Sequence, residues 1–164
     1  MTFQRLNINL IHVTCSADLR TGETLAWMNY IVENYNKLPD HVVFLSDSGP
    51  DWHSTADWAI SIRTSAPKCR QALGIRLIDN NAPTKEDESA LSYILETLAN
   101  AKYDQKLQDG VCCSESIISR ESIRQYPIER YRILRDKIFE SRNGSPDLWS
   151  YGFERCYAQL FNHC

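Results

Sequence analysis

The stretch that most constrains the fold of this chain is TLAWMNYIVENYNKLPDHVVFLSDSGPDWH, residues 24–53. Apolar residues recur at helical spacing over residues 25–35, which predicts an amphipathic helix with one face on a core. The Leu-Pro-Asp at 38–40 ends this helix, because proline has no amide hydrogen and restricts the residue before it. The apolar run at 41–45 then predicts a strand that is buried on both faces.

Polar side chains follow this strand directly. Open α/β sheets bind ligands at the carboxyl ends of their strands, so we expect a binding site here. Its candidate substrate-binding residues are Asp47, Asp51, Trp52 and His53. The two aspartates can hold a divalent cation, and the tryptophan can provide a stacking wall for a ligand. Core packing explains Trp52 equally, and a structural hydrogen bond explains His53, so the sequence leaves the metal and the ligand open.

Further elements follow from periodicity and turn chemistry. We expect helices over residues 54–65, from Thr84 to Leu98, from Pro127 to Ile138 and from Asp147 to Phe161. Their inward residues include Ala90, Leu91, Ile94, Leu95, Leu98, Ile128, Tyr131, Leu134, Ile138, Leu148, Tyr151, Cys156, Leu160 and Phe161. Strands are expected at residues 7–13, 41–46, around 75–78 and at 111–118. Together these elements predict one α/β domain over residues 1–164, with three layers and a small, mostly parallel (mixed) sheet flanked by helices.

Composition narrows the class of protein. The net charge is −3 and the basic residues are spread along the chain, which argues against a nucleic-acid surface. We expect no membrane span and no leader, because the apolar runs are short and the start lacks a basic segment and a cleavage site. The six cysteines include no Cys-x-x-Cys pair. We therefore expect free thiols in a cytoplasmic chain, rather than a zinc site or disulfides.

Three segments carry a resemblance to a known family. They are WMNYIVENYNKLPDHVVFLSDSGPDWH, IISRESIRQYPIERYRIL and YGFERCYAQLF. In order and spacing they resemble a family of glycosyltransferase-like domains of unknown function, common in fungi and also found in bacteria and large viruses. The resemblance implies a GT-A-like fold, truncated here at the N-terminus because family members begin with a further strand. It also implies a nucleotide-sugar donor and a glycan or small hydroxyl acceptor as partners.

The resemblance also points to individual residues. Glu154 and Glu23 match family carboxylates and are the candidate catalytic residues, while Arg120 and Arg155 are candidate substrate-binding residues. A carboxylate held in a cleft can deprotonate an acceptor hydroxyl. Each carboxylate also has a structural explanation: Glu154 as the ion-pair partner of Arg120 or Arg124, and Glu23 as a helix cap.

Two functions are consistent with these patterns. The first is a small glycosyltransferase-like enzyme with its pocket at the carboxyl ends of the strands, closed by the last helix. The second is a non-catalytic binding or scaffold domain descended from such enzymes, favoured by the missing upstream strand and by the lack of an Asp-x-Asp motif. The second predicts a blocked cleft with Glu154 paired to Arg120.

Overall fold

The computed structural model describes residues 22–45, 62, 67–73, 85–104, 115–141, 148–162 and 164, and it is of the mixed α/β class, as the sequence predicts. The helices are α1 (Gly22–Asn34), the short 3-10 helix η3 (Tyr35–Lys37), α3 (Lys85–Ala99), α4 (Arg120–Arg124), α5 (Ile128–Glu140) and α6 (Leu148–Phe161); the strands are β1 (His41–Phe44), β2 (Arg70–Ala72) and β3 (Ser116–Ser119). The strands predicted at 7–13 and 75–78 lie outside the described residues. So does the helix predicted at 54–65, apart from Ile62, which is helical.

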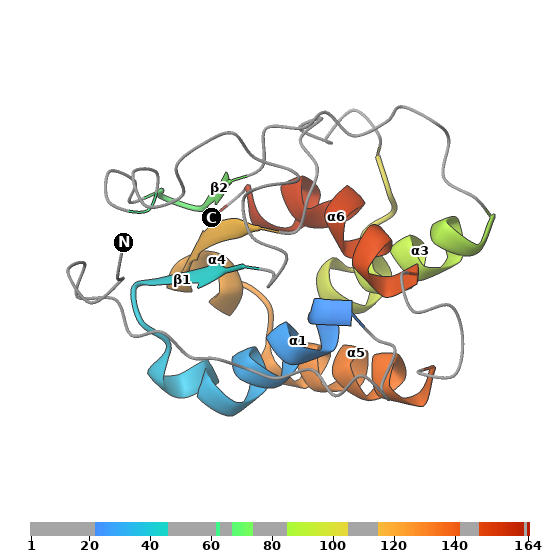
Figure 1. Cartoon of the computed structure of the whole chain (residues 1–164), viewed down its shortest axis with the longest axis horizontal. Helices are drawn as coiled ribbons and strands as arrows, with labels where there is room; N and C mark the ends of the chain where they lie inside the picture. Colours follow the sequence, from blue (N-terminus) through green and yellow to red (C-terminus); the bar gives the residue numbers. More distant parts are fainter. Residues whose placement is uncertain are drawn as a thin grey trace.

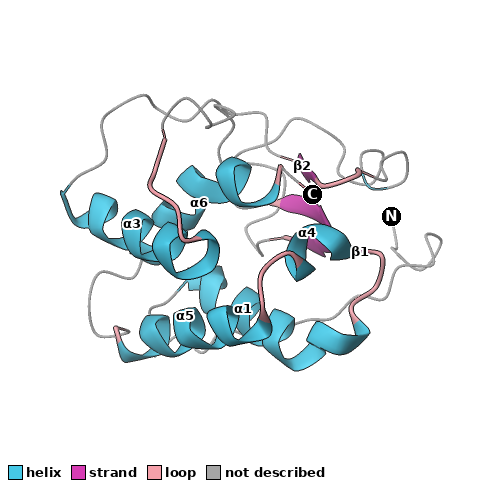
Figure 2. Cartoon of the chain, turned by 180° about the vertical axis from the view of Figure 1, so that it is seen from behind, coloured by secondary structure: helices cyan, strands magenta, loops and turns pink. Residues whose placement is uncertain are grey.

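The long helices lie side by side in two pairs, α1 with α5 and α3 with α6 (Figures 1 and 2). The predicted inward faces are confirmed over most of their length, and together they form one hydrophobic core. Two residues differ from the prediction: Ile128 is only half-buried, and Tyr151 is 52% exposed. Tyr151 is exposed because α6 turns its neighbour Gly152, and not Tyr151, toward α3.

Gly152 permits the close approach of α6 to α3. A Cβ atom at this position would lie 3.1 Å from Ile94 Cδ1 and 3.4 Å from the Leu91 nitrogen. We therefore expect Gly152→Leu to lower the free energy of unfolding by about 1–3 kcal/mol, measured by urea denaturation, because the extra side chain forces the helices apart. Gly152→Ala is the matched control. The end of the flexible Ile94 side chain can yield to one methyl group, and the helix gains about 1 kcal/mol from replacing glycine. Equal denaturation curves for the two variants would contradict this packing.

The sheet has the strand order β1-β3-β2, and both pairings are antiparallel. The prediction of a mostly parallel sheet is therefore wrong for the described strands, and these give no support to a GT-A-like arrangement. The end of β3 returns to the start of β1, where the Arg120 amide donates to the Asp40 carbonyl oxygen at 2.9 Å. The sequence missed this because short apolar runs indicate strands but do not encode which distant strand pairs with which, or in what direction.

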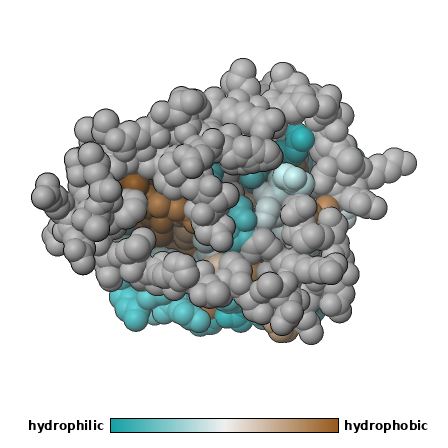
Figure 3. Space-filling model, viewed as in Figure 1, coloured by the Kyte–Doolittle hydropathy of each residue, from teal (hydrophilic) through white to brown (hydrophobic). Residues whose placement is uncertain are grey.

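Burial also differs between the strands. In β1 the buried side chains, Val42 and Phe44, alternate with half-buried ones, whereas every residue of β3 is buried. The prediction that β1 is covered on both faces is therefore wrong, since β3 is the middle strand of the described sheet and β1 lies at its edge. In Figure 3 the atoms over β1 are hydrophobic, while those at the end of α1 and at η3, along the lower edge, are hydrophilic.

The described helices and the sheet form two layers, whereas three were predicted. Val42, Phe44 and Ile118 belong to the core that the helices share, so the described helices pack against one face of the sheet. Ile117 alternates with Ile118 and points to the other face, where it is 1% exposed. The described residues thus form two layers, a helical layer and a sheet, and the third predicted layer is not among them.

One disulfide corrects the expectation of free thiols. Cys69, just before β2, is bonded to Cys164 at the C-terminus, with a Cα–Cα distance of 5.6 Å. Sequence spacing could not reveal this pair, because the two cysteines are 95 residues apart. Cys156 is reduced and buried, as predicted. Disulfides are typical of oxidising compartments. The cysteines therefore no longer support the expectation of a cytoplasmic chain.

Candidate functional site

Tyr157 is the centre of the candidate site. It lies on α6 and is 2% exposed, with its ring centroid 5.6 Å from that of Phe153 and 5.7 Å from that of Phe161. Trp27 of α1 contacts the same ring edge to face, at 6.2 Å. The aromatic side chains fix the tyrosine in place between α1 and α6.

A cation lies on the ring of Tyr157. The Arg70 guanidinium carbon is 5.3 Å from the ring centroid, within the range of a cation–π interaction. Arg70 Nε donates to Ser116 Oγ at 3.1 Å, which ties the guanidinium to the neighbouring strand. The antiparallel register pairs Arg70 with Ile118, so the arginine lies on the face of the sheet that meets the helices.

Both predicted catalytic carboxylates approach the same tyrosine. Burial raises the pKa of Tyr157 well above its usual value; Arg70 lowers that pKa, and Glu23 and Glu154 each raise it. Glu23 at the start of α1 and Glu154 in α6 are therefore each close enough to Tyr157 to act on its charge. Both carboxylates are half-buried, and all three charged side chains have interaction partners. We call Glu23, Arg70, Glu154 and Tyr157 the Tyr157 cluster.

This arrangement has definite chemical capacities. A half-buried carboxylate can accept hydrogen bonds from sugar hydroxyl groups or take a proton from one. A guanidinium presents a fork of donors that suits carboxylate and phosphate oxygens. The Tyr157 cluster therefore offers both a base and a cation to a ligand that carries hydroxyl groups and negative charge.

Sequence reasoning missed Arg70 and Tyr157. Arg70 stands in the least periodic part of the chain, where no strand was predicted, so nothing indicated its neighbours. Tyr157 was not among the inward residues expected for the last helix, although its neighbour Cys156 was. One signal was present: Tyr157 follows Glu154 by three residues, a spacing that places two side chains on the same face of a helix.

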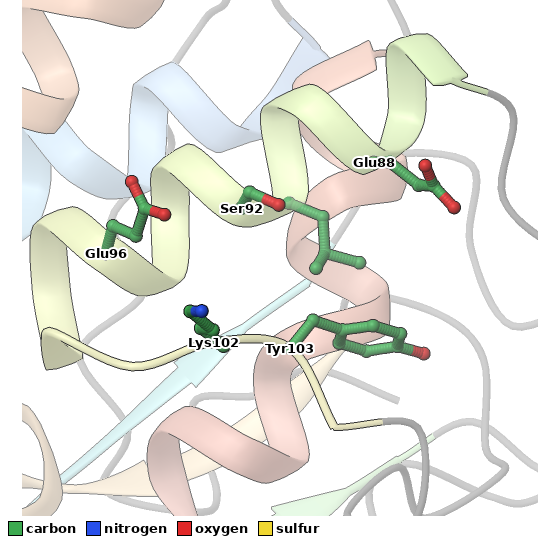
Figure 4. A pocket seen from close by; sticks show the side chains of 6 residues that line it. Glu88, Ser92, Glu96, Lys102 and Tyr103 are labelled. Atoms are coloured by element: carbon green, nitrogen blue, oxygen red, sulfur yellow. The ribbon is translucent and has the colours of Figure 1, made fainter.

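Arg155 belongs to a different place on the surface. It forms a side-chain hydrogen bond with Tyr103, whose pKa is raised by burial and lowered by this arginine. Tyr103 lines a groove of about 350 Å³ beside α3, shown in Figure 4. The other residues that line it are Glu88, Leu91, Ser92, Glu96 and Lys102. The structure thus separates Arg155 from Glu154, although they are neighbours in sequence.

Arg120, the first residue of α4, contacts the segment that precedes β1. Its Nη2 lies 2.8 Å from Asp40 Oδ1, its Nε lies 3.8 Å from a Glu121 oxygen, and its Nη1 donates to the Leu38 carbonyl oxygen. Arg124 donates to the carbonyl oxygen of Tyr35. Both arginines therefore hold the segment that leads into β1, and the ion pair considered for Glu154 stays a prediction.

The remaining predicted residues, Asp47, Asp51, Trp52 and His53, lie outside the described residues. Over the part of the chain that the structure describes, no group of three or more His, Cys, Asp or Glu side chains is placed to hold a metal ion. The predicted cation at Asp47 and Asp51 therefore stays a prediction.

Segments that carry the family resemblance also contact one another. The last carbonyl oxygens of α6 accept hydrogen bonds from Ser122 Oγ, at 2.8 Å, and from Gln125 Nε2 and Tyr126 Oη, each at 2.7 Å. Tyr35 Oη donates to the Tyr126 carbonyl oxygen at 2.6 Å. These side chains satisfy carbonyl groups that a helix end leaves without partners, so much of the shared pattern serves the fold.

Buried acids predict a loss of stability in alkali. Burial raises the pKa of Tyr126 to about 12, and it also raises the pKa of Tyr131 and of the Cys156 thiol. A pKa that is higher in the folded than in the unfolded chain gives stability that is complete below the unfolded value and is lost as the pH rises toward the folded one. We expect the free energy of unfolding to fall from about pH 9, where a thiol begins to ionise in the unfolded chain, and more steeply from about pH 10, by about 1.4 kcal/mol per pH unit for each group.

Urea denaturation from pH 8 to pH 11 measures this change. Cys156→Ala is the control, because it should remove the part of the decline that begins below pH 10 and leave the tyrosine part. A free energy of unfolding that stays constant up to pH 11 would contradict the burial of these groups.

Comparisons place the chain in a family. The profile of a family described as "Protein of unknown function (DUF3431)" matches residues 60–164, whereas no curated protein and no solved structure matches the chain. Two of the three resembling segments lie inside the matched range. The description names no activity, so the likeness to glycosyltransferases stays a prediction. None of the helices within the described ranges is long and apolar enough to cross a membrane. Since the match covers well over half of its residues, the chain belongs to the DUF3431 family of proteins of unknown function.

Proposed function

We propose that this protein transfers a sugar from a nucleotide-sugar donor to a hydroxyl acceptor at the Tyr157 cluster. The observation that carries the proposal is that the charges of Glu23 and Glu154 both act on Tyr157, beside which the Arg70 guanidinium lies. The two glutamates lie far apart in the sequence, and both match carboxylates of the family resemblance. A single site that binds sugar hydroxyl groups would explain why both carboxylates lie near Tyr157.

The three charged members of the cluster each have a role in the proposed reaction. Glu154 takes the proton of the acceptor hydroxyl as the acceptor oxygen bonds to the anomeric carbon of the sugar. The bond from that carbon to the diphosphate breaks, and the electron pair leaves with the nucleotide diphosphate. Arg70 lies where its charge stabilises that leaving group, and Glu23 holds sugar hydroxyl groups by hydrogen bonds.

Thermal denaturation with added ligands tests the proposal. The protein is mixed with nucleotide diphosphates and their sugar conjugates, each with and without Mg²⁺ or Mn²⁺. A ligand present at a hundred times its dissociation constant adds about 2.7 kcal/mol to the free energy of unfolding, which raises the melting temperature of a domain of this size by several degrees. If none of these ligands changes the melting temperature, the proposed function is wrong.

A non-catalytic binding domain is the second candidate. The observation that favours it is the structural use of a predicted ligand residue, since Arg120 pairs with Asp40 at 2.8 Å. This candidate predicts that a nucleotide sugar binds and is recovered intact after incubation with hydroxyl acceptors. The release of free nucleotide diphosphate, measured by chromatography, would exclude it.

A further inference from the structure

The disulfide joins the two elements that carry the centre of the candidate site. Cys69 immediately precedes Arg70, the cation on the ring of Tyr157. Cys164 follows the end of α6, the helix that carries Tyr157 and Glu154. In Figure 1 the C-terminus lies beside β2. The covalent bond therefore fixes the strand of the arginine against the helix of the tyrosine.

Among the described residues, β2 is held by its pairing with β3 and by the contacts of Arg70 with Ser116 and Tyr157. The strand has only three residues, all of them half-buried, and it lies at the edge of the described sheet. Beyond the pairing itself, the Ser119 amide donates to the Cys69 carbonyl oxygen at 2.8 Å, and the Leu73 amide donates to the Glu115 carbonyl oxygen at 3.0 Å. Short edge strands with few buried contacts are among the first parts of a protein to open.

The bond is also open to chemical attack. Cys164 is exposed and Cys69 is half-buried, so a small thiol can reach the Sγ atom of Cys164. Cys156 is fully buried, next to Tyr157, and its Sγ lies 3.6 Å from the Phe153 carbonyl oxygen. Its burial raises the pKa of its thiol, which keeps it in the unreactive form. Of the cysteines that the structure describes, those of the exposed bridge, and not the buried Cys156, are therefore open to redox chemistry.

We propose that Cys69–Cys164 is a redox switch that holds Arg70 in the Tyr157 cluster while it is oxidised and releases β2, with Arg70, when it is reduced. The regulatory meaning of the switch rests on the proposed function of that cluster. The reductant is a dithiol. One of its thiolates attacks Cys164 Sγ, the bond to Cys69 Sγ breaks, and Cys69 leaves as a thiolate that takes up a proton. The second thiol then closes on the first, so that Cys164 is released as a thiol and the reagent becomes a cyclic disulfide.

Amide hydrogen exchange of the whole chain, with and without dithiothreitol, tests the switch. After reduction we expect the Ser119 and Leu73 amides to exchange about tenfold faster or more, because the hydrogen bonds that hold β2 open locally. The amides of Leu134 and Ile138 in α5 should keep their rates. Limited digestion gives a second readout, since trypsin should cleave after Arg70 faster in the reduced protein.

The double variant Cys69→Ala/Cys164→Ala is the control for the remaining cysteines. It should exchange like the reduced wild-type protein and should not respond to dithiothreitol. Unchanged exchange at Ser119 and Leu73 after reduction would overturn the proposal. Faster exchange throughout α5 would overturn it too, because that result means global unfolding and not the local release of β2.

The switch and the function can fail separately. If reduction opens β2 but no nucleotide sugar binds either form, the switch stands and the proposed function falls. If a nucleotide sugar binds the oxidised protein and reduction leaves both the exchange and the affinity unchanged, the function stands and the switch falls. With both correct, the dissociation constant rises by about tenfold or more on reduction, since a charge-assisted contact to phosphate is lost.

Discussion

Glu154→Gln is expected to lower the turnover of glycosyl transfer by about 10²–10⁴-fold, because the amide cannot take the proton of the acceptor hydroxyl. The fold should be almost unaffected. Glutamine keeps the shape of the side chain, and an ion pair of a half-exposed carboxylate contributes only about 0–1 kcal/mol to stability. The release of nucleotide diphosphate and a urea denaturation curve, recorded on the same preparation, measure both effects.

Two matched substitutions make this result specific. Glu140→Gln removes an exposed carboxylate at the end of α5 and should change neither turnover nor stability. Glu23→Gln should lose about 1 kcal/mol of stability, as expected for a carboxylate near a helix start, together with affinity for the sugar. If Glu154→Gln instead lowers the free energy of unfolding by about 3–5 kcal/mol, Glu154 is the buried partner of an ion pair. It would then not be the catalytic base.

Tyr131→Ala is expected to lower the free energy of unfolding by about 3–5 kcal/mol, as large-to-small changes in a core do. Tyr131 is 0% exposed, and its ring lies 6.2 Å from that of Tyr35 and 6.4 Å from that of Tyr126. Its hydroxyl group donates to the Ile123 carbonyl oxygen at 2.9 Å. The substitution therefore opens a cavity where three parts of the chain meet, and urea denaturation measures the cost.

Tyr131→Phe separates the hydrogen bond from the packing. It keeps the ring, so it should cost only about 1 kcal/mol. Ile133→Ala, at a position that is 54% exposed on the same helix, should change stability by less than about 0.5 kcal/mol. A Tyr131→Ala variant as stable as Ile133→Ala would show that the contacts among the shared segments do not support the fold.

The helices were predictable because their signals are local. The periodicity of Leu91, Ile94, Leu95 and Leu98 identifies the buried face of α3 without any knowledge of its partner. The short helix α4 was missed, although it carries a local signal: Ser119 Oγ accepts a hydrogen bond from the Ser122 amide and caps the helix. A helix of five residues is too short to show a period.

The sheet and the disulfide depend on distant parts of the chain. The pairing of Val42 with Ile118 and the bond between Cys69 and Cys164 each join segments that are far apart in sequence. Neither the direction of a strand pair nor the connectivity of cysteines follows from composition or spacing. The order of the predicted elements favoured a mostly parallel sheet, which is the wrong topology for the strands that the structure describes.

The candidate site was predictable from the sequence only in part. Glu23 and Glu154 match the family pattern in the sequence, and in the fold both raise the pKa of Tyr157. Arg120 and Arg155 match it too, but they contact Asp40 and Tyr103. A residue type and a motif position suggest which side chains can do chemistry, but only the packing of α1, β2 and α6 decides which of them share a site.

A crystal structure with a soaked nucleotide sugar and Mn²⁺ tests the central claim most directly. The account predicts that the sugar hydroxyl groups lie within hydrogen-bond distance, about 3 Å, of the Glu23 and Glu154 carboxylates, with the diphosphate toward Arg70. A nucleotide sugar bound in the groove beside Tyr103, or anywhere else away from Tyr157, would contradict it.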